Sequence, residues 1–299
     1  MNFLKSLVVG MVLLTLSILQ IPAQVIFSDN FDSYNTGALD KNLSGGPNAA
    51  PNGSGNPWFG PAPPNFQVVT AEHGVTPLSG THMIRGVYNA TDGDQDFYNL
   101  AYRVGGGNSF LGNVSLSWNF YDPLGTGTGS ANYQDYNALT HYTINSTTTT
   151  DQTGTGIGNM PSYQGGSADQ RLSLGAFSTT GTDATKYQAR VVGATDGLTP
   201  TSGWFNLNVT RSVGWHSAAI VLGSPNGVNT AVSFYIDGVD VLDHALDTTA
   251  GVNYIEMNGS TGSVSGWYDN LAFSQVPEPS TVALLLCGGL SCLALRRRK

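Results

Sequence analysis

Charged side chains are scarce in this chain of 299 residues, where they make up 11 % of the sequence, against about 25 % in ordinary globular proteins. Cysteine is scarcer still: the two that occur, Cys287 and Cys292, both fall in an apolar run near the C-terminus. Because the rest of the chain has no cysteine, it can neither be cross-linked by disulfide bonds nor bind a metal ion through thiolates. Glutamate is also rare, with Glu72, Glu256 and Glu278 as its three positions.

The residues that are abundant predict a β protein. Glycine occurs 38 times, and clusters of Gly, Ser, Thr and Asn separate short stretches in which apolar and polar residues alternate. In "VSLSWNFY" every second residue from Val114 to Phe120 is apolar, as in a half-buried strand. In "AVSFYIDGVDVL" the dipeptide Asp237-Gly238 predicts a hairpin turn between two strands. No amphipathic helical run of useful length occurs between residues 24 and 275.

The N-terminal segment has the pattern of a secretory signal peptide. Lys5 precedes an apolar stretch over residues 7–19, and Pro22-Ala23 supplies a small-residue cleavage site. We expect cleavage after Ala23, so that residues 1–23 form the signal peptide. An uncleaved membrane anchor is the alternative, and the short apolar stretch closed by Pro22 argues against it.

The C-terminal segment, residues 276–299, has three parts in a fixed order. They are the motif Pro277, Glu278, Pro279, the uncharged stretch 281–295, and the basic tail Arg296, Arg297, Arg298, Lys299. As a helix the stretch spans roughly 22 Å at 1.5 Å per residue, short of the roughly 30 Å of a bilayer core. Long arginine side chains can compensate by reaching the interface, and the basic tail is expected on the cytoplasmic side. We predict a transmembrane helix here.

This order of features resembles the PEP-CTERM sorting signal. The resemblance implies processing by an exosortase, a membrane-embedded Cys-dependent enzyme, in bacteria that secrete extracellular polysaccharide. It implies an exported protein with an inner-membrane-anchored precursor, later found at the cell surface or outside the cell. Because the two prolines disfavour a helix, we expect the tail to be a transient anchor that is cut near Pro277-Glu278-Pro279.

The body between these segments, residues 24–275, is strongly acidic. Five of the 12 basic residues and one of the 20 acidic residues lie in the terminal segments, which leaves 7 basic against 19 acidic residues in the body. Such a body should be repelled by nucleic acid and by anionic lipid surfaces. About 250 residues are enough to bury a core, and we expect one domain.

Three stretches of the body resemble the laminin-G/concanavalin-like jelly roll. They are Trp215-His216, Tyr235-Ile236-Asp237-Gly238 and Trp267-Tyr268-Asp269-Asn270. The resemblance implies an antiparallel β-sandwich, a fold that hosts lectins, adhesion modules and some glucanases. We further expect the first and last segments of the body to be neighbours in one sheet, because this covers edges that would otherwise pair with other chains.

The residue inventory argues against an enzyme. Retaining glycoside hydrolysis needs two carboxylates about 5 Å apart, whereas Glu72 and Glu256 are far apart and neither has an alternating carboxylate on its stretch. The chain has no Gly-x-Ser-x-Gly elbow, and its five histidines show no two-His ligand spacing. For His216 we expect a structural hydrogen bond rather than catalysis. The prediction is therefore that the body is not an enzyme.

Two groups of residues are candidates for ligand binding. Asp92, Asp94 and Asp96 in "TDGDQDF" resemble the opening of a calcium loop, although the EF-hand pattern fails further on, and a solvated acidic turn is the favoured alternative. Trp58 and Trp204 are candidates to contact a sugar ring, if they are exposed, while core packing is the commoner role for such residues.

Two function classes follow from these observations. The first is an exported protein with a noncatalytic body, structural or carbohydrate-binding, in the envelope or in the extracellular polysaccharide matrix of a biofilm. The second is a glycan-active, glucanase-like enzyme with atypical carboxylates. No cofactor is expected apart from calcium at the acidic stretch.

Overall fold

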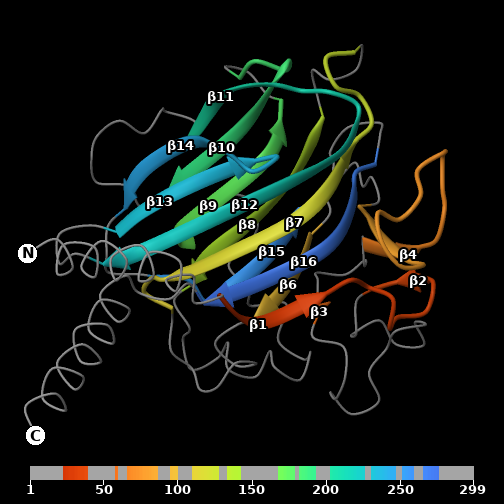
Figure 1. Cartoon of the computed structure of the whole chain (residues 1–299), viewed down its shortest axis with the longest axis horizontal. Coiled ribbons are helices and arrows are strands. Elements are labelled where there is room, and N and C mark those ends of the chain that lie inside the picture. The colour runs from red at the N-terminus through yellow and green to blue at the C-terminus, as the bar shows by residue number, and fades with distance from the viewer. Residues whose placement is uncertain are drawn as a thin grey trace, which may run out of the picture.

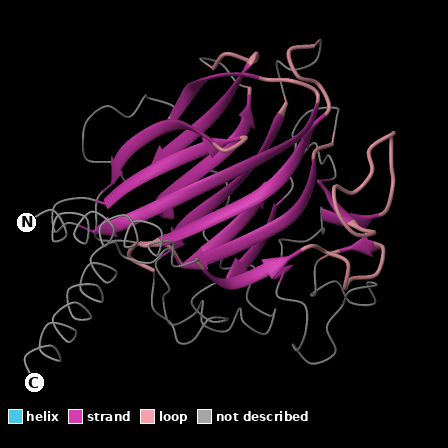
Figure 2. Ribbon diagram, viewed as in Figure 1, coloured by secondary structure: helices cyan, strands magenta, loops and turns pink. Residues whose placement is uncertain are grey.

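The computed structural model of the chain describes residues 23–39, 58–59, 66–86, 95–99, 110–127, 133–142, 168–178, 182–192, 203–225, 230–246, 251–258 and 265–275. All regular secondary structure in these ranges is β-strand, which confirms the predicted all-β fold (Figure 2). None of these residues belongs to a helix with the length and hydropathy needed to cross a bilayer. Residues 1–22 and the sorting segment 276–299 lie outside the described residues.

The strands form two sheets, and all their pairs are antiparallel. The nine-stranded sheet has the order β14 (Val239–Leu246), β13 (Thr230–Ile236), β12 (Gly214–Pro225), β7 (Val114–Asp122), β16 (Trp267–Gln275), β5 (Met83–Gly86), β4 (Phe66–Val69) and β2 (Gly37–Ala38), with β1 (Gln24–Asp29) also paired to β16. The seven-stranded sheet has the order β11 (Trp204–Thr210), β10 (Lys186–Val192), β9 (Ala168–Phe177), β8 (Gln134–Tyr142), β15 (Tyr254–Asn258), β6 (Gln95–Asn99) and β3 (Trp58–Phe59). The two sheets overlie each other in Figure 1, and the fold is the predicted antiparallel jelly-roll sandwich.

The first and last strands of the body lie side by side, as expected from the sequence. β1 pairs with β16 from Gln24↔Gln275 to Asp29↔Leu271. β16 in turn pairs with β7 on its other side, so the last strand is an interior strand of the nine-stranded sheet.

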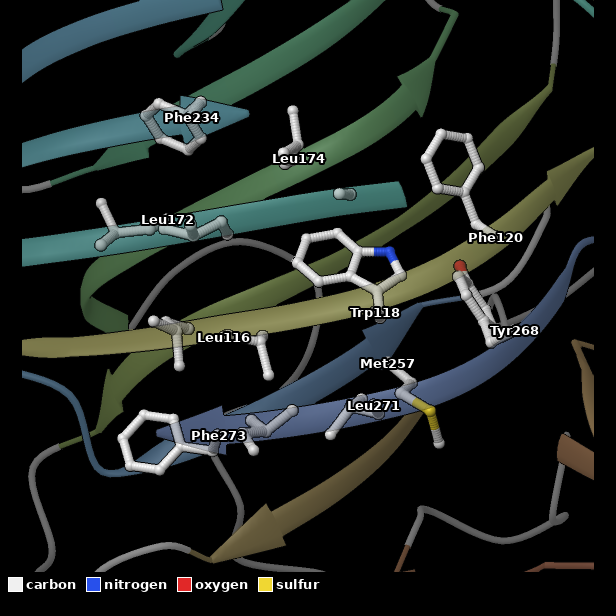
Figure 3. Packing of buried hydrophobic residues seen from close by; sticks show 14 of the residues in the cluster. Leu116, Trp118, Phe120, Leu172, Leu174, Phe234, Met257, Tyr268, Leu271 and Phe273 are labelled. Carbon is white, nitrogen blue, oxygen red and sulfur yellow. The ribbon is translucent and has the colours of Figure 1, made fainter. Parts of the chain in front are cut away.

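The core lies between the sheets and follows the alternation of the strands. β7 alternates buried and half-buried residues over its whole length, as its sequence predicts. Its Leu116, Trp118 and Phe120 pack in one cluster with Leu172 and Leu174 of β9 in the other sheet (Figure 3). This alternation also decides which side chains of each strand point away from the core.

The hairpin predicted at Asp237-Gly238 is present between β13 and β14. Both turn residues have positive φ, 50° for Asp237 and 75° for Gly238, which is the requirement of a type I′ turn. Ile236 and Val239 are the pair that closes the hairpin. The turn therefore fixes where the Asp237 carboxylate lies relative to β12, the next strand of the sheet.

Candidate polysaccharide site

One face of the seven-stranded sheet points away from the core, and we call it the polar face. On β15, Ile255 and Met257 belong to the core cluster, so Tyr254, Glu256 and Asn258 point to the opposite side. The same reasoning applies to β8 and β9, where alternate residues enter the core. The register then places Ala138 of β8 beside Glu256, and Thr140 beside Tyr254.

A buried ion pair crosses the polar face. Arg171 Nη2 of β9 donates to Glu256 Oε2 at 3.0 Å and to Oε1 at 3.3 Å. Asn258 Nδ2 donates to Glu256 Oε1 at 2.5 Å. The side chain of Glu256 is 0 % exposed and that of Arg171 is 9 % exposed. A buried carboxylate needs such partners, because an unpaired buried charge is costly.

The pair spans β8, which lies between β9 and β15 in the sheet. Two strand spacings amount to about 10 Å, a distance that two long side chains can bridge if the residue between them is small. Ala138 of β8 is paired both to Glu256 of β15 and to Ser173 of β9. The small methyl group of Ala138 leaves room for the Arg171 guanidinium to pass across β8.

Two hydroxyl groups beside the pair are buried without a hydrogen-bond partner. They are Thr140 Oγ1 and Ser173 Oγ, both in residues that are 0 % exposed. Thr140 pairs with Arg171 in the ladder, and Ser173 lies two residues further along β9 on the same face. Buried polar atoms are nearly always hydrogen-bonded in folded proteins, and these two are among several side-chain atoms of the described residues that lack a partner. A ligand that carries hydroxyl or carboxylate groups would provide one.

Aromatic residues gather further along the polar face, around Trp204 of β11. Its ring stacks on Phe177 with centroids 4.0 Å apart and an interplanar angle of 6°. Tyr136 meets it edge-on at 5.0 Å, and the Arg190 guanidinium lies 5.8 Å from its centroid. Trp204 is 5 % exposed, which disfavours its candidate role in sugar contact and agrees with the alternative of core packing. Packing against aromatic neighbours is the physical reason.

Trp58 is also buried rather than exposed. It is 0 % exposed, and its Nε1 donates to Asp29 Oδ2 at 2.8 Å. Phe27 and Phe31 lie 6.1 Å and 6.3 Å from it between ring centroids. Burial raises the pKa of Asp29, while the bonds from Trp58, Tyr34 and the Phe31 amide act in the opposite direction. Trp58 therefore packs in the core near β1, and its ring is not accessible to a sugar.

The acidic stretch proposed to bind calcium is described only in part. Asp92 and Asp94 lie outside the described residues, and Asp96 belongs to β6, whose backbone pairs with β15 and β3. Asp96 therefore lies in a strand, and calcium binding by Asp92, Asp94 and Asp96 stays a prediction. The aromatic pair Phe97-Tyr98 favours a strand there. The described part of the chain holds no group of three or more His, Cys, Asp or Glu side chains able to hold a metal ion.

Each glutamate of the body forms an ion pair with an arginine, and the two pairs lie on different sheets. Glu72 Oε1 accepts from Arg85 Nη1 at 2.6 Å beside the nine-stranded sheet, while Glu256 lies on the polar face. Sequence reasoning missed the partner of Glu256 because Arg171 is 85 residues away in the chain. The isolated Glu of "YIEMNGS" gave no sign of a site. The sorting residues Pro277, Glu278, Pro279 and the basic tail lie outside the described residues.

Comparison with known proteins identifies the C-terminal segment. Residues 275–299 match the PEP-CTERM protein-sorting motif, so this is an exported protein that carries a sorting signal, as the sequence predicted. No curated protein matches the chain.

Among solved structures, the chain is similar in fold to proteins named as an alginate lyase, a carbohydrate esterase and a glucanase. A complex of the alginate lyase Aly36B with alginate trisaccharide aligns with 13 % identity and a TM-score of 0.49, covering 86 % of this chain and 100 % of that chain. A carbohydrate esterase from the Shiga toxin-encoding bacteriophage phi24B aligns with 14 % identity and a TM-score of 0.46, again covering 86 % and 100 %. The endo-1,3-beta-glucanase of Streptomyces sioyaensis aligns with 14 % identity and a TM-score of 0.43, covering 85 % and 97 %.

These neighbours correct the prediction that the body is not an enzyme. All three are named as enzymes, whereas the prediction excluded an enzyme. The prediction rested on the lack of two carboxylates on one strand. Such a test overlooks groups that the sheet brings together from different strands, as it does for Arg171 and Glu256. At this level of identity the likeness concerns the fold, and no substrate is transferred from it.

Proposed function

We propose that the exported body is a glycan-active protein that binds an extracellular polysaccharide across the polar face of the seven-stranded sheet. The observation behind this proposal is the group formed by the Arg171–Glu256 ion pair and the two partnerless hydroxyls beside it. Three adjacent strands, β9, β8 and β15, bring these residues together on the side of the sheet that faces away from the core.

The residue types on this face suit sugar recognition. A sugar offers hydroxyl groups that both donate and accept hydrogen bonds, and acidic sugars add a carboxylate. Glu256 accepts, the Asn258 amide and the Arg171 guanidinium donate, and the Thr140 and Ser173 hydroxyls do both. A guanidinium can also bind a carboxylate through two parallel hydrogen bonds. Because these side chains are buried in the structure, the face has to open for a polysaccharide chain to meet them.

Glu256 is the candidate for proton transfer on the bound sugar once the face has opened around it. Cleavage of a glycosidic bond, by water or by elimination, needs a side chain that accepts or donates a proton within hydrogen-bond reach of the sugar. Arg171 and Asn258 hold the Glu256 carboxylate in one orientation through both of its oxygens. This orientation is what a positioned acid or base requires.

Processing and location complete the proposal. An exosortase recognises the PEP-CTERM segment, cuts near Pro277-Glu278-Pro279, and releases the body to the cell surface or to the polysaccharide matrix. The body would then reach its ligand outside the inner membrane. Support for this sequence of events comes from the matched sorting motif at residues 275–299.

Binding and turnover of defined polysaccharides test the proposed function. The purified exported protein is mixed with alginate as an acidic glycan and laminarin as a neutral one. Retardation in affinity gels, new reducing ends and unsaturated uronides are then measured. Wild type should bind at least one of the two, and Glu256→Gln should lower binding or product formation at least tenfold. Glu72→Gln is the matched control, because it also removes a carboxylate from an arginine but lies beside the other sheet. Equal losses in both variants, or no binding by wild type to either glycan, would count against the proposal.

A further inference from the structure

A second group of polar residues lies at one end of the nine-stranded sheet, away from the polar face. Ser212 Oγ lies 3.2 Å from His216 Nε2, and His216 Nδ1 lies 2.8 Å from Asp237 Oδ2. We propose that these three residues form a Ser-His-Asp triad in which Ser212 is the nucleophile, giving the protein a hydrolytic activity on short acyl esters. Triads are recognised by such geometry and not by sequence order.

The fold brings these residues together from three places. Ser212 lies in the connection between β11 and β12, His216 lies on β12, and Asp237 lies in the β13–β14 turn. The turn is tied to β12 by two hydrogen bonds: the Asp237 amide donates to Ser217 O at 2.8 Å, and the Ser217 amide donates to Asp237 Oδ1 at 2.9 Å. One carboxylate oxygen is thus anchored to the backbone, and the other faces the histidine.

The imidazole ring of His216 has a defined position. Its side chain is 10 % exposed, and the rings of Phe120 and Tyr187 each lie 5.5 Å away between centroids. A carboxylate oxygen can only accept, so the contact with Asp237 places a hydrogen on Nδ1. In the neutral ring, Nε2 then carries the lone pair that a general base needs, and it faces the Ser212 hydroxyl.

A further contact would accept a hydrogen from the protonated ring. His216 Nε2 also lies 2.9 Å from the backbone oxygen of Ser212. This oxygen cannot donate to a neutral Nε2, but it accepts the hydrogen that Nε2 carries once the ring is protonated. The imidazolium formed during the reaction therefore has an acceptor on each side, Asp237 Oδ2 and Ser212 O. In the neutral ring with a hydrogen on Nδ1, the Nε2 lone pair would face the Ser212 backbone oxygen, so the ring has to turn toward Ser212 Oγ before it can act as the base.

Ser212 itself is exposed, while the residue before it is firmly held. The Arg211 guanidinium makes two bonds to Asp122, Nε to Oδ2 at 2.8 Å and Nη2 to Oδ1 at 2.9 Å, and both side chains are 0 % exposed. The Arg211 amide donates to Thr185 O at 2.9 Å. Two residues after Ser212, a Cβ placed on Gly214 would meet no atom within 4 Å. A substrate thus has open space beside a fixed backbone.

The reaction that follows consumes only an ester and water. Ser212 Oγ forms a bond to the ester carbonyl carbon as its proton moves to His216 Nε2. Collapse of the tetrahedral intermediate breaks the carbon–oxygen bond, and the departing alcohol takes the proton from Nε2. Water then attacks the acyl-serine with the same base, which yields a carboxylic acid and free Ser212. An exposed serine suits an ester that projects from a larger molecule, such as an acyl group on a polysaccharide hydroxyl.

Labelling with a fluorophosphonate and hydrolysis of p-nitrophenyl acetate test this proposal on the purified exported protein. Peptide mapping should find the label on Ser212. Ser212→Ala should abolish the label and lower the hydrolysis rate at least about 100-fold, and Asp237→Asn should lower it at least about tenfold. Ser233→Ala is the matched control, because Ser233 Oγ lies 2.5 Å from the Asp243 carboxylate on the same sheet and contacts no histidine among the described residues. It should leave both readouts unchanged.

Circular dichroism and melting curves show whether each variant is folded, and Ser212→Ala removes one exposed oxygen, so it should retain the wild-type melting temperature. A label on any residue other than Ser212, or hydrolysis by folded Ser212→Ala at the wild-type rate, would overturn the proposal. Equal losses in Ser212→Ala and Ser233→Ala would overturn it as well. The assay uses no polysaccharide, so its result is independent of ligand binding at the polar face.

Discussion

Gln24 and Gln275 face each other as the outermost pair of the β1–β16 ladder. The predicted signal-peptide cleavage site, after Ala23, immediately precedes this pair in the chain, and Pro277 of the sorting motif follows two residues after it. Both predicted processing sites are therefore attached to the same corner of the body.

A disulfide between the two positions tests this ladder. Facing residues of antiparallel strands have Cα atoms about 4.5–5.5 Å apart, within the range of about 4.4–6.8 Å that a disulfide accepts. We expect Gln24→Cys with Gln275→Cys, in a chain whose two native cysteines are serine, to oxidise within one molecule and to raise the melting temperature. Gln24→Cys with Asp240→Cys should stay reduced, because β14 lies five strands from β1, about 24 Å away. Free thiols in the first variant after air oxidation would contradict the ladder.

The Arg171–Glu256 pair should matter more for stability than the Arg85–Glu72 pair. The first pair is 9 % and 0 % exposed at its two side chains, the second 22 % and 25 %. Arg171→Met leaves a buried carboxylate without its cation and should lower the free energy of unfolding by about 3–5 kcal/mol. Arg85→Met should cost about 1 kcal/mol or less. Urea denaturation of both variants measures the difference. Equal losses of unfolding free energy would contradict the expectation that burial makes the Arg171–Glu256 pair the more important one.

Asp135 should make the protein less stable as the pH rises toward 7. Burial raises the pKa of this carboxyl to about 7, while hydrogen bonds from Tyr268 and Tyr133 oppose the rise and the nearby Asp122 and Arg211 have smaller, opposite effects. In the unfolded chain its pKa is about 3.9. The folded state therefore holds this proton up to a higher pH than the unfolded state does.

The sign follows from that difference. Below about pH 4 Asp135 is protonated in both states and the folded state loses nothing. Between about pH 4 and 7 the stability falls, and the full loss, on the order of 4 kcal/mol, is reached once the folded carboxyl is ionised. Asp135→Asn should remove this part of the pH dependence and be more stable than wild type at pH 8. Parallel stability curves for the two proteins from pH 4 to 8 would contradict it.

The local features of the fold were predictable because their signals are local. The alternation of β7 and the Asp237-Gly238 hairpin each depend on fewer than a dozen consecutive residues, and both are present. Trp58 and Trp204 were harder to place, because a Gly/Pro-rich neighbourhood does not reveal whether a ring turns inward. Their burial depends on distant partners, Asp29 for one and Phe177 for the other.

Both candidate sites depend on pairings that a single sequence does not display. Arg171 reaches Glu256 only because β8, with Ala138, lies between their strands. His216 was expected to make a structural hydrogen bond, and it does contact Asp237, but its contact with Ser212 arises from the bend between β11 and β12. The order of the strands thus brings together side chains whose neighbours in the sequence showed no sign of a site.

The most direct test of the central claim uses the two partnerless hydroxyls of the polar face. A hydroxyl that is buried without a partner weakens the fold, so Thr140→Val with Ser173→Ala should keep or raise the melting temperature. If the hydroxyls serve a ligand, the same double variant should bind alginate or laminarin, whichever the wild type binds, at least tenfold more weakly. Ser224→Ala, which removes a hydroxyl bonded to Asn113 on the other sheet, should bind as wild type does. A double variant that binds with wild-type affinity would contradict the claim that the polar face is the polysaccharide site.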